Sequence, residues 1–267
     1  ADTMAPLAPS LGIDLEQLEK ADAILLIGSN PRHDQPLINH RIRKAALAGA
    51  KVIVVNPVDY DFNFPVSEKL IVAPSQLSAA LGGIAKHATD ARSEGDGVRT
   101  ALASFAATAE HESIAAILRD ADVAVVVTGN FAQRHPNYGQ IGILSNVIAN
   151  AVSAKHGQLT DGANAAGAWL AGAVPHRGPS GRKLTTAGHD ADRMFDAPLE
   201  AYILLGLEPE LDCLRPQKAI EALRSGFVVA LTAFRNPSLE TAADVLLPIA
   251  AFAENEGSYV NVVGQWQ

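Results

Sequence analysis

The fold class follows from residues Ala21–Pro57, which read ADAILLIGSNPRHDQPLINHRIRKAALAGAKVIVVNP. Two short apolar runs, Ala23–Ile27 and Lys51–Val55, are each followed by turn residues. Uniformly apolar runs of this length are typical of strands that are buried on both faces of a sheet. Between them, Pro36–Ala48 has a helical pattern, with a proline in its first turn and a glycine just after its end. The stretch therefore predicts a strand–helix–strand unit with parallel strands and a right-handed crossover.

The same order of apolar run, turn and helix recurs along the chain. Further apolar runs predict strands at Leu70–Val72, Val123–Thr128, Tyr202–Leu205, Phe227–Thr232 and Ala243–Pro248. Helical periodicity predicts further helices at Leu15–Ala21, Ser75–His87, Thr100–Ala109, Glu112–Arg119, Gly139–Lys155 and Gln217–Arg224. Strands that alternate with helices predict the α/β class, here with two doubly wound, Rossmann-like units built on parallel sheets.

A polar connector at Thr89–Arg99 marks the expected division between the two units. Residues 1–98 would then form part of the first α/β unit, and residues 99–267 the second. Periodicity is lost across residues 156–198, which hold seven glycines and three prolines. We expect a long irregular loop there, of a length that is usually functional or mobile in a compact chain.

The charge balance and the cysteine content exclude several classes of function. The chain has 267 residues, 21 basic and 29 acidic side chains and a formal net charge of −8. This balance argues against binding of nucleic acid, because proteins that neutralise phosphates carry a basic face. The single cysteine, Cys213, excludes an internal disulfide and a cysteine-rich zinc site or iron–sulfur cluster held by this chain alone. We interpret it as a structural thiol.

The sequence contains no pattern for insertion into a membrane. It has no run of about 18 apolar residues, so we expect no membrane-spanning helix. Without a demand for disulfides, a cytoplasmic location is the default expectation. Residues Ala1–Ser10 lack an initiator methionine and the pattern of a signal peptide, and they resemble the start of an excised segment or a linker.

Two strand-end turns are the candidate ligand-binding residues. Gly28, Ser29 and Asn30 follow the first predicted strand, where backbone amides and the next helix N-terminus suit a phosphate-bearing ligand. Asp59 follows the second strand, where an acidic side chain can bind a ribose or a base edge. The chain has neither G-x-G-x-x-G at this turn nor a Walker motif. An ordinary turn at each position therefore remains the competing interpretation.

No catalytic residue and no metal ligand is predicted. His111 begins an H-E-x-x-H pattern, but residue 115 is alanine, so the zinc motif is incomplete. No G-x-S-x-G nucleophile motif occurs, and Glu254 and Glu256 have no nucleophile beside them in the sequence. The basic segment HRGPSGRK (His176–Lys183) is interpreted either as a site for an anionic cofactor or acidic partner, or as a solvated loop.

The chain resembles the molybdopterin-oxidoreductase family through an ordered series of segments. They are ADAILLIGSNP (Ala21–Pro31), GAKVIVVNP (Gly49–Pro57), LIVAPSQLSAAL (Leu70–Leu81), VVVTGNF (Val125–Phe131), YILLGLEPELD (Tyr202–Asp212) and ADVLLPIAAFAENEGSYVNVVGQWQ (Ala243–Gln267). Gln265 departs from the pattern, since a basic residue is common there. Two segments, ANAAGAWLAGAVPHR (Ala163–Arg177) and ENEGSYVN (Glu254–Asn261), are similar to the branch that forms the large iron–sulfur subunit of bacterial respiratory NADH:quinone oxidoreductases.

This resemblance implies a function for the strand-end turns. Gly28, Ser29, Asn30 and Asp59 match positions that hold a pterin-guanine dinucleotide in the molybdenum enzymes of the family. In the respiratory branch these positions would be vestigial. The chain would then be a non-catalytic scaffold with no cofactor of its own, and iron–sulfur clusters would lie in an upstream part. Its partners would be other subunits of a complex on the cytoplasmic side, peripheral to the inner membrane.

Two alternatives remain open at the level of sequence. The chain could be a segment of an active oxidoreductase of the formate dehydrogenase type with two molybdopterin-guanine dinucleotides, which requires an upstream cysteine cluster and a metal ligand. It could also be a free-standing nucleotide-binding module. If the first α/β unit is incomplete, unpaired sheet edges predict that the isolated chain self-associates.

Overall fold

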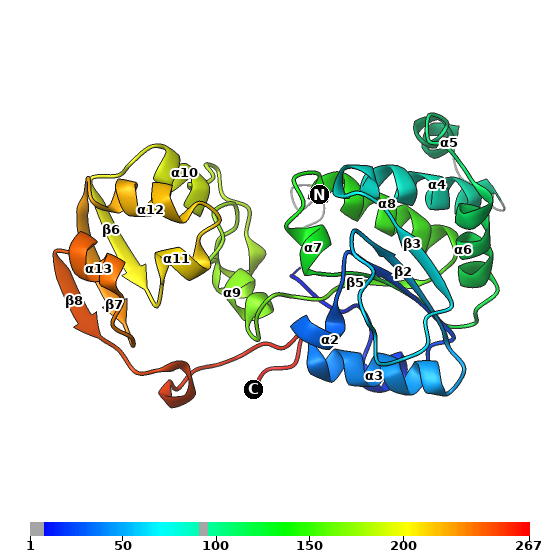
Figure 1. The fold of residues 1–267 in the computed structure, drawn as a ribbon, viewed down its shortest axis with the longest axis horizontal. Helices are drawn as coiled ribbons and strands as arrows, with labels where there is room; N and C mark the ends of the chain where they lie inside the picture. Colours follow the sequence, from blue (N-terminus) through cyan, green and yellow to red (C-terminus); the bar gives the residue numbers. More distant parts are fainter. Residues whose placement is uncertain (1–7, 91–95) are drawn as a thin grey trace. The chain divides into compact units, whose positions relative to one another are not determined.

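The computed structural model describes residues 8–90 and 96–267 (Figure 1). The chain forms two compact units, the first comprising Ala1–Trp169 with Tyr259–Gln267 and the second Leu170–Ser258. This division differs from the predicted boundary at residues 98 and 99. The difference arises because strands on both sides of that boundary pair within one sheet, which a local change in composition cannot reveal.

The first unit is built on a five-stranded parallel sheet in the order β3-β2-β1-β4-β5. Its strands are β1 (Ala23–Ile27), β2 (Lys51–Asn56), β3 (Glu68–Ile71), β4 (Ala124–Thr128) and β5 (Lys155–Gln158). All five residues of β1 are buried, as its uniform apolar pattern predicts. β5 begins at Lys155, the last residue of the helix predicted over Gly139–Lys155, and runs into residues 156–198, for which the sequence predicts an irregular loop. Its sequence, KHGQ, carries no apolar pattern, because an edge strand is only partly buried.

Helices cover both faces of this sheet (Figure 1). Odd-numbered residues of β1, such as Leu25, pack with α4, α6 and α8, whereas Ile24 and Leu26 pack with α1 and α3. The helices of the unit are α1 (Leu15–Leu18), α2 (Pro31–Asp34), α3 (Pro36–Leu47), η1 (Pro74–Gln76), α4 (Leu77–Asp90), α5 (Asp96–Leu102), α6 (Ala109–Arg119), α7 (Asn130–Gln133) and α8 (Tyr138–Ala151). The helix predicted over Thr100–Ala109 overlaps α5 only at its first residues, because α5 ends at Leu102. Thr108 is instead the N-cap of α6, and its side chain accepts the His111 N–H.

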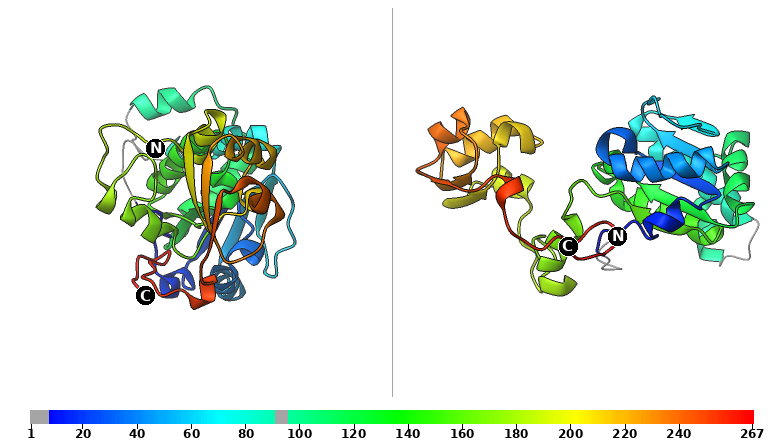
Figure 2. Two further views of the ribbon diagram at one scale, coloured as in Figure 1. Left: turned by 90° about the vertical axis from the view of Figure 1, so that its left-hand side faces the viewer. Right: turned by 90° about the horizontal axis from the view of Figure 1, so that it is seen from below.

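The second unit carries a three-stranded parallel sheet in the order β6-β7-β8, whose strands run side by side (Figure 2). They are β6 (Ala201–Leu205), β7 (Phe227–Thr232) and β8 (Val245–Pro248). Its helical elements are η2 (Pro179–Gly181), α10 (Ala191–Asp196), α11 (Pro209–Asp212), α12 (Pro216–Leu223), α13 (Pro237–Ala242) and η3 (Phe252–Glu254). α9 (Ala165–Ala171) crosses the division between the units. The predicted α/β class with two parallel-sheet units is confirmed.

Among the residues that the structure describes, no helix has the length and apolar character needed to cross a membrane.

Candidate functional site

The winding of the five-stranded sheet reverses between β1 and β4. The chain runs outward from β1 to β2 and β3, and then returns to place β4 on the other side of β1. In open α/β sheets, ligands bind at the carboxyl ends of the two strands that flank such a reversal. Gly28, Ser29 and Asn30 follow β1 at this place, and Gly129 follows β4. The structure therefore places the predicted turn at the topological position of a ligand site.

The two strand-end turns pack directly against each other. Gly28 has a φ of +55°, and a Cβ there would lie 2.6 Å from the Ala132 backbone nitrogen. A Cβ on Gly129 would lie 2.4 Å from the Ser29 Cβ. The Phe131 N–H donates to the Gly28 carbonyl oxygen at 3.0 Å. The close approach of α7 thus fills the space directly in front of the first turn.

A buried asparagine holds Ser29 in place. The Ser29 N–H donates to Asn56 Oδ1 at 2.8 Å, and Asn56 Nδ2 donates to the Ser29 carbonyl oxygen at 2.9 Å. Asn56 ends β2 and is fully buried. From the sequence it is interpreted only as part of a turn. The sequence does contain a signal for this contact. An asparagine at the end of a buried strand needs a polar partner, which a neighbouring strand-end turn can provide.

The other two predicted site residues have different surroundings. Asn30 is the N-cap residue of α2, although its side chain accepts no capping hydrogen bond. Asp59 follows β2, and its carboxylate lies 2.6 Å from Lys69 Nζ of β3. This carboxylate is exposed and already paired with a lysine. A carboxylate that recognises a ribose or a base edge would instead be expected to be buried and free to bind the ligand.

A cavity of about 680 Å³ lies beside the β4 turn. Polar groups that line this cavity bind one another. Arg134 forms an ion pair with Asp161, and Asn130 Nδ2 donates to Asp161 Oδ1 at 3.1 Å. Gln35 Nε2 donates to Asn130 Oδ1 at 3.2 Å. The lining residues are Asp34, Pro74, Ser75, Asn130, Phe131, Arg134, His135, Pro136, Asn137 and Asp161.

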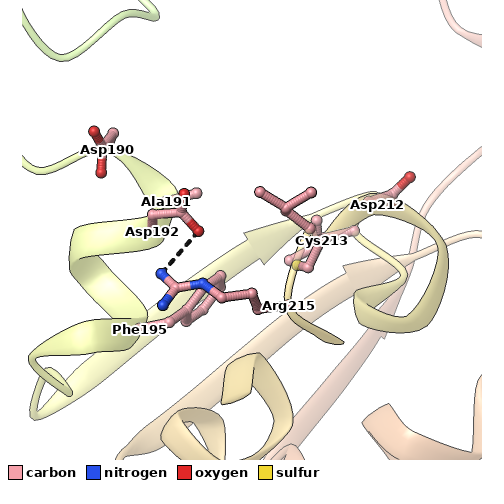
Figure 3. Close-up of a pocket in the computed structure, with 9 residues that line it drawn as sticks. Asp190, Ala191, Asp192, Phe195, Asp212, Cys213 and Arg215 are labelled. Carbon is pink, nitrogen blue, oxygen red and sulfur yellow. Dashed lines mark hydrogen bonds and ion pairs between the residues drawn. The ribbon is translucent and has the colours of Figure 1, made fainter. Parts of the chain in front are cut away.

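A second cavity, of about 390 Å³, is lined by residues between α10 and the start of α12 (Figure 3). Arg215 forms ion pairs with Asp192 at 3.0 Å and with Asp196 at 2.8 Å. Hydrogen bonds from Arg215 and Lys218 lower the pKa of Asp196 to about 2. Burial raises the pKa of the Cys213 thiol, and Asp212 and Asp192 raise it further. A raised pKa disfavours the thiolate, so this cavity contains no activated nucleophile at Cys213.

The remaining sequence candidates do not assemble into a catalytic or metal site. In the described ranges, no three histidine, cysteine, aspartate or glutamate side chains are grouped so that they could hold a metal ion. His111 lies in the first turn of α6, where its Nδ1 accepts the Thr108 N–H at 3.2 Å. In the basic segment, Arg177 is buried while Arg182 and Lys183 are exposed, so the three cations do not form one surface cluster.

We expect replacement of Ser29 by alanine to leave stability unchanged or to raise it by up to about 1 kcal/mol. Ser29 is 1% exposed, and its Oγ has no hydrogen-bond partner among the described residues. Removing a buried hydroxyl without a partner removes a desolvation cost. Urea unfolding at neutral pH measures the change. A loss of more than about 2 kcal/mol would mean that the hydroxyl is hydrogen-bonded in the folded protein.

His156 is expected to make the first unit less stable in mild acid. Burial lowers its pKa below the ordinary 6.5. The unfolded chain therefore takes up this proton at a higher pH than the folded chain does. The stabilising contribution is complete above about pH 6.5 and is lost as the pH falls toward the folded-state pKa. Between pH 8 and pH 5, urea unfolding should show a smaller loss of stability in His156→Gln than in the unsubstituted protein. Identical losses in the two proteins would show that His156 does not cause the acid destabilisation.

Comparison with a solved structure supports the fold. The formyltransferase/hydrolase complex from Methylorubrum extorquens, solved with methylofuran, contains a chain that matches with a TM-score of 0.65 and 17% sequence identity. The match covers 99% of this chain and 73% of that chain. At this level of identity the likeness shows the fold alone.

Curated relatives are named as subunits of NADH-quinone or NADH-ubiquinone oxidoreductases. A subunit of the NADH-quinone oxidoreductase of Streptomyces coelicolor is 29% identical over 280 residues, which cover 95% of this chain and 30% of that protein. Its counterpart in Mycobacterium tuberculosis is 26% identical over 283 residues, with coverages of 96% and 31%. The mitochondrial NADH-ubiquinone oxidoreductase 78 kDa subunit of Candida albicans is 24% identical over 255 residues, with coverages of 95% and 29%. The chain thus spans about a third of the length of these relatives.

A family profile described as molybdopterin oxidoreductase matches residues 7–267. This match spans both units and includes the turns that follow β1, β2 and β4. The resemblance predicted from the ordered sequence segments is therefore confirmed, and the chain belongs to the molybdopterin oxidoreductase family.

Proposed function

We propose that this chain is a structural, non-catalytic segment of a respiratory NADH:quinone oxidoreductase subunit. The names of its relatives support this proposal, because they align over nearly the whole chain. The observation that carries it is the closed packing of the turns after β1 and β4. In such a subunit the α/β units would position neighbouring parts of the complex, while electrons pass through iron–sulfur clusters held upstream of this segment.

Three backbone N–H groups at the reversal of the sheet are committed within the protein, which argues against a pterin dinucleotide there. Phosphates at a strand end need backbone N–H groups that are free to donate. Here the N–H groups of Gly28, Ser29 and Phe131 donate to Val55, Asn56 and Gly28 respectively. The guanidinium beside the neighbouring cavity, Arg134, is paired with Asp161. These contacts support the interpretation of Gly28, Ser29, Asn30 and Asp59 as vestigial, and no chemical step is assigned to them.

An active molybdenum oxidoreductase is the second candidate, because the family match and the cavity of about 680 Å³ beside the β4 turn both favour it. In that case Arg134 and Asn130 would have to exchange Asp161 for the ligand. The two candidates differ in whether the native protein contains molybdenum and guanine nucleotide. This difference can be measured without an activity assay.

Elemental and nucleotide analysis of the native protein, purified from its own host, tests the proposal. Iron without molybdenum, and no guanine nucleotide released on denaturation, is the expected result. Molybdenum close to one atom per protein, together with guanine nucleotide, would overturn it and make the Gly28 and Asp59 turns part of a working cofactor site.

Separated from its neighbours in a complex, the chain is expected to self-associate. In the part of the chain that the structure describes, the edge strands β3, β6 and β8 each pair with a strand on one side only, and such edges recruit further strands. In the native complex, on the cytoplasmic side of the inner membrane, other subunits would cover these sheet edges. Sedimentation velocity over a hundredfold range of concentration measures the association, and a monomer throughout that range would contradict it.

A further inference from the structure

Residues 103–108, which connect α5 to α6, lie against α4, a helix that α5 and α6 also contact (Figure 1). Phe105 packs so closely on Gly82 of α4 that a Cβ on this glycine would overlap the Phe105 ring. Lys86 Nζ of α4 donates to the carbonyl oxygens of Ala103 and Phe105, both at 3.2 Å. We call residues 103–108 the strap, because these contacts hold them on α4.

His111 holds the end of the strap. Its Nδ1 accepts the Thr108 N–H at 3.2 Å, and Thr108 Oγ1 accepts the His111 N–H at 3.4 Å. This is a reciprocal capping box at the start of α6, with histidine in the position that glutamate or glutamine usually occupies. The imidazole is buried against α4, since a Cβ on Gly83 would overlap His111 Nδ1. The capping hydrogen bond is therefore shielded from water.

This capping hydrogen bond requires a neutral imidazole. An Nδ1 that accepts a hydrogen bond carries no proton, and protonation would turn it into a donor that faces the Thr108 N–H. The Thr108 N–H would then lose its acceptor, which destabilises the closed strap. A cation in the first turn of a helix is also disfavoured by the helix dipole. Protonation of His111 therefore opposes closure of the strap.

Among the residues that the structure describes, the ionisable groups that act on His111 are a second histidine and one glutamate. The histidine is His87 of α4, which lies one helical turn after Gly83. Its Nε2 is buried and has no hydrogen-bond partner in the described ranges, and its carbonyl oxygen accepts from Arg119 of α6 at 3.2 Å. The glutamate is Glu110, the neighbour of His111 on α6. The strap itself carries no ionisable side chain.

These surroundings disfavour the protonated form of His111. Burial lowers its pKa below the ordinary 6.5, His87 lowers it further, and Glu110 opposes this in part. In an open strap the imidazole would be solvated, and its pKa would return toward 6.5. The open state therefore takes up the proton at a higher pH than the closed state does. The contribution of His111 to closure is complete above about pH 6.5 and is lost as the pH falls toward the closed-state pKa.

We propose that His111 is a pH-sensitive switch that controls the attachment of the strap to α4. In mild acid its protonation releases residues 103–108, while the five-stranded sheet stays folded. The contacts that hold the strap are made with α4 and α6 rather than with the sheet, so local opening costs less than global unfolding. Release exposes Phe105 and uncovers the turn of α4 beneath it. This inference does not depend on the redox role proposed above.

Hydrogen exchange measured by mass spectrometry on the native protein that contains this chain tests the proposal. Peptides that cover residues 103–112 should lose protection by about threefold to thirtyfold between pH 7.5 and pH 5, after correction for the intrinsic pH dependence of exchange. Peptides from β1 are the reference, because they report global unfolding. Unchanged protection of residues 103–112 would overturn the proposal. An equal loss of protection in β1 would also overturn it, because the whole unit would then be unfolding.

Substitution of His111 by glutamine in the same native protein isolates the proton. Glutamine is a usual residue at this position of a capping box, so His111→Gln can keep the cap without titrating. Protection of residues 103–112 in this variant should change by less than about twofold between pH 7.5 and pH 5. His156→Gln is the matched control, since it removes the other buried histidine with a lowered pKa and should leave the loss at the strap intact. A loss of protection that persists in His111→Gln would overturn the proposal.

A second variant keeps the test decisive if His111→Gln does not fold. His87→Gln removes the imidazole that disfavours protonation of His111 in the closed strap. The closed-state pKa of His111 then moves closer to 6.5, so the loss of protection at residues 103–112 should become smaller than in the unsubstituted protein. An undiminished loss in His87→Gln would overturn the proposal in that case.

Discussion

Replacement of Gly28 by alanine should destabilise the first unit by about 2–5 kcal/mol. Two costs combine at this position. The left-handed φ of +55° is unfavourable for any residue with a Cβ, and the added carbon would lie 2.6 Å from the Ala132 nitrogen and 2.8 Å from its Cβ. Relief of that contact would require α7 to move away from the end of β1. Urea unfolding, with hydrogen exchange to assign each transition to its unit, measures the loss.

Gly206 provides the matched control for this substitution. It has nearly the same conformation, φ +61°, but a Cβ there would meet no atom within 4 Å. Gly206→Ala should therefore cost only the conformational part, about 1–2 kcal/mol, in the second unit. Equal losses at the two positions would mean that α7 does not pack closely on Gly28. A larger loss at Gly28 would support a turn that is closed by packing rather than open to a ligand.

The strands that could be predicted from sequence are those that are buried on both sides. β1, β2 and β4 have continuous apolar runs because neighbouring strands and two helix layers surround them. The sequence does not predict β5, since a partly buried edge strand reading KHGQ has no such run. The division between the units also differs from the boundary that the sequence predicts. β1 pairs with β4 about 100 residues later, and this pairing depends on long-range register that no local pattern contains.

The candidate site was predictable in position but not in its contacts. The sequence predicts the turn Gly28–Asn30 because strand-end turns in parallel sheets have a characteristic composition. Its closure depends on Ala132 and Asn56, which come from other strand ends and meet the turn only through the strand order. The sequence therefore predicts where the candidate site lies. Whether the turn there is closed or open to a ligand depends on tertiary contacts, which the sequence does not reveal.

Replacement of Asn56 by leucine should cost about 2–5 kcal/mol, because it leaves two buried backbone groups of Ser29 without their partners. These are the Ser29 N–H, which donates to Asn56 Oδ1, and the Ser29 carbonyl, which accepts from Asn56 Nδ2. Leucine has a similar volume, so the loss reports the hydrogen bonds rather than a cavity. Asn137→Leu is the control, since Asn137 is exposed and should change stability by no more than about 0.5 kcal/mol.

The Asn56→Leu variant also separates a structural turn from a ligand-binding one. If the turn is structural, the Ser29 N–H is committed to Asn56, and the loss of stability should be the same with or without added guanine nucleotide. If a nucleotide phosphate normally accepts this N–H, added nucleotide should instead stabilise the unsubstituted protein, by about 2.7 kcal/mol at a hundredfold excess over the dissociation constant. Urea unfolding of both proteins with and without the nucleotide distinguishes the two cases. Because Asn56 already satisfies both backbone groups of Ser29, we expect no nucleotide-dependent stabilisation of either protein.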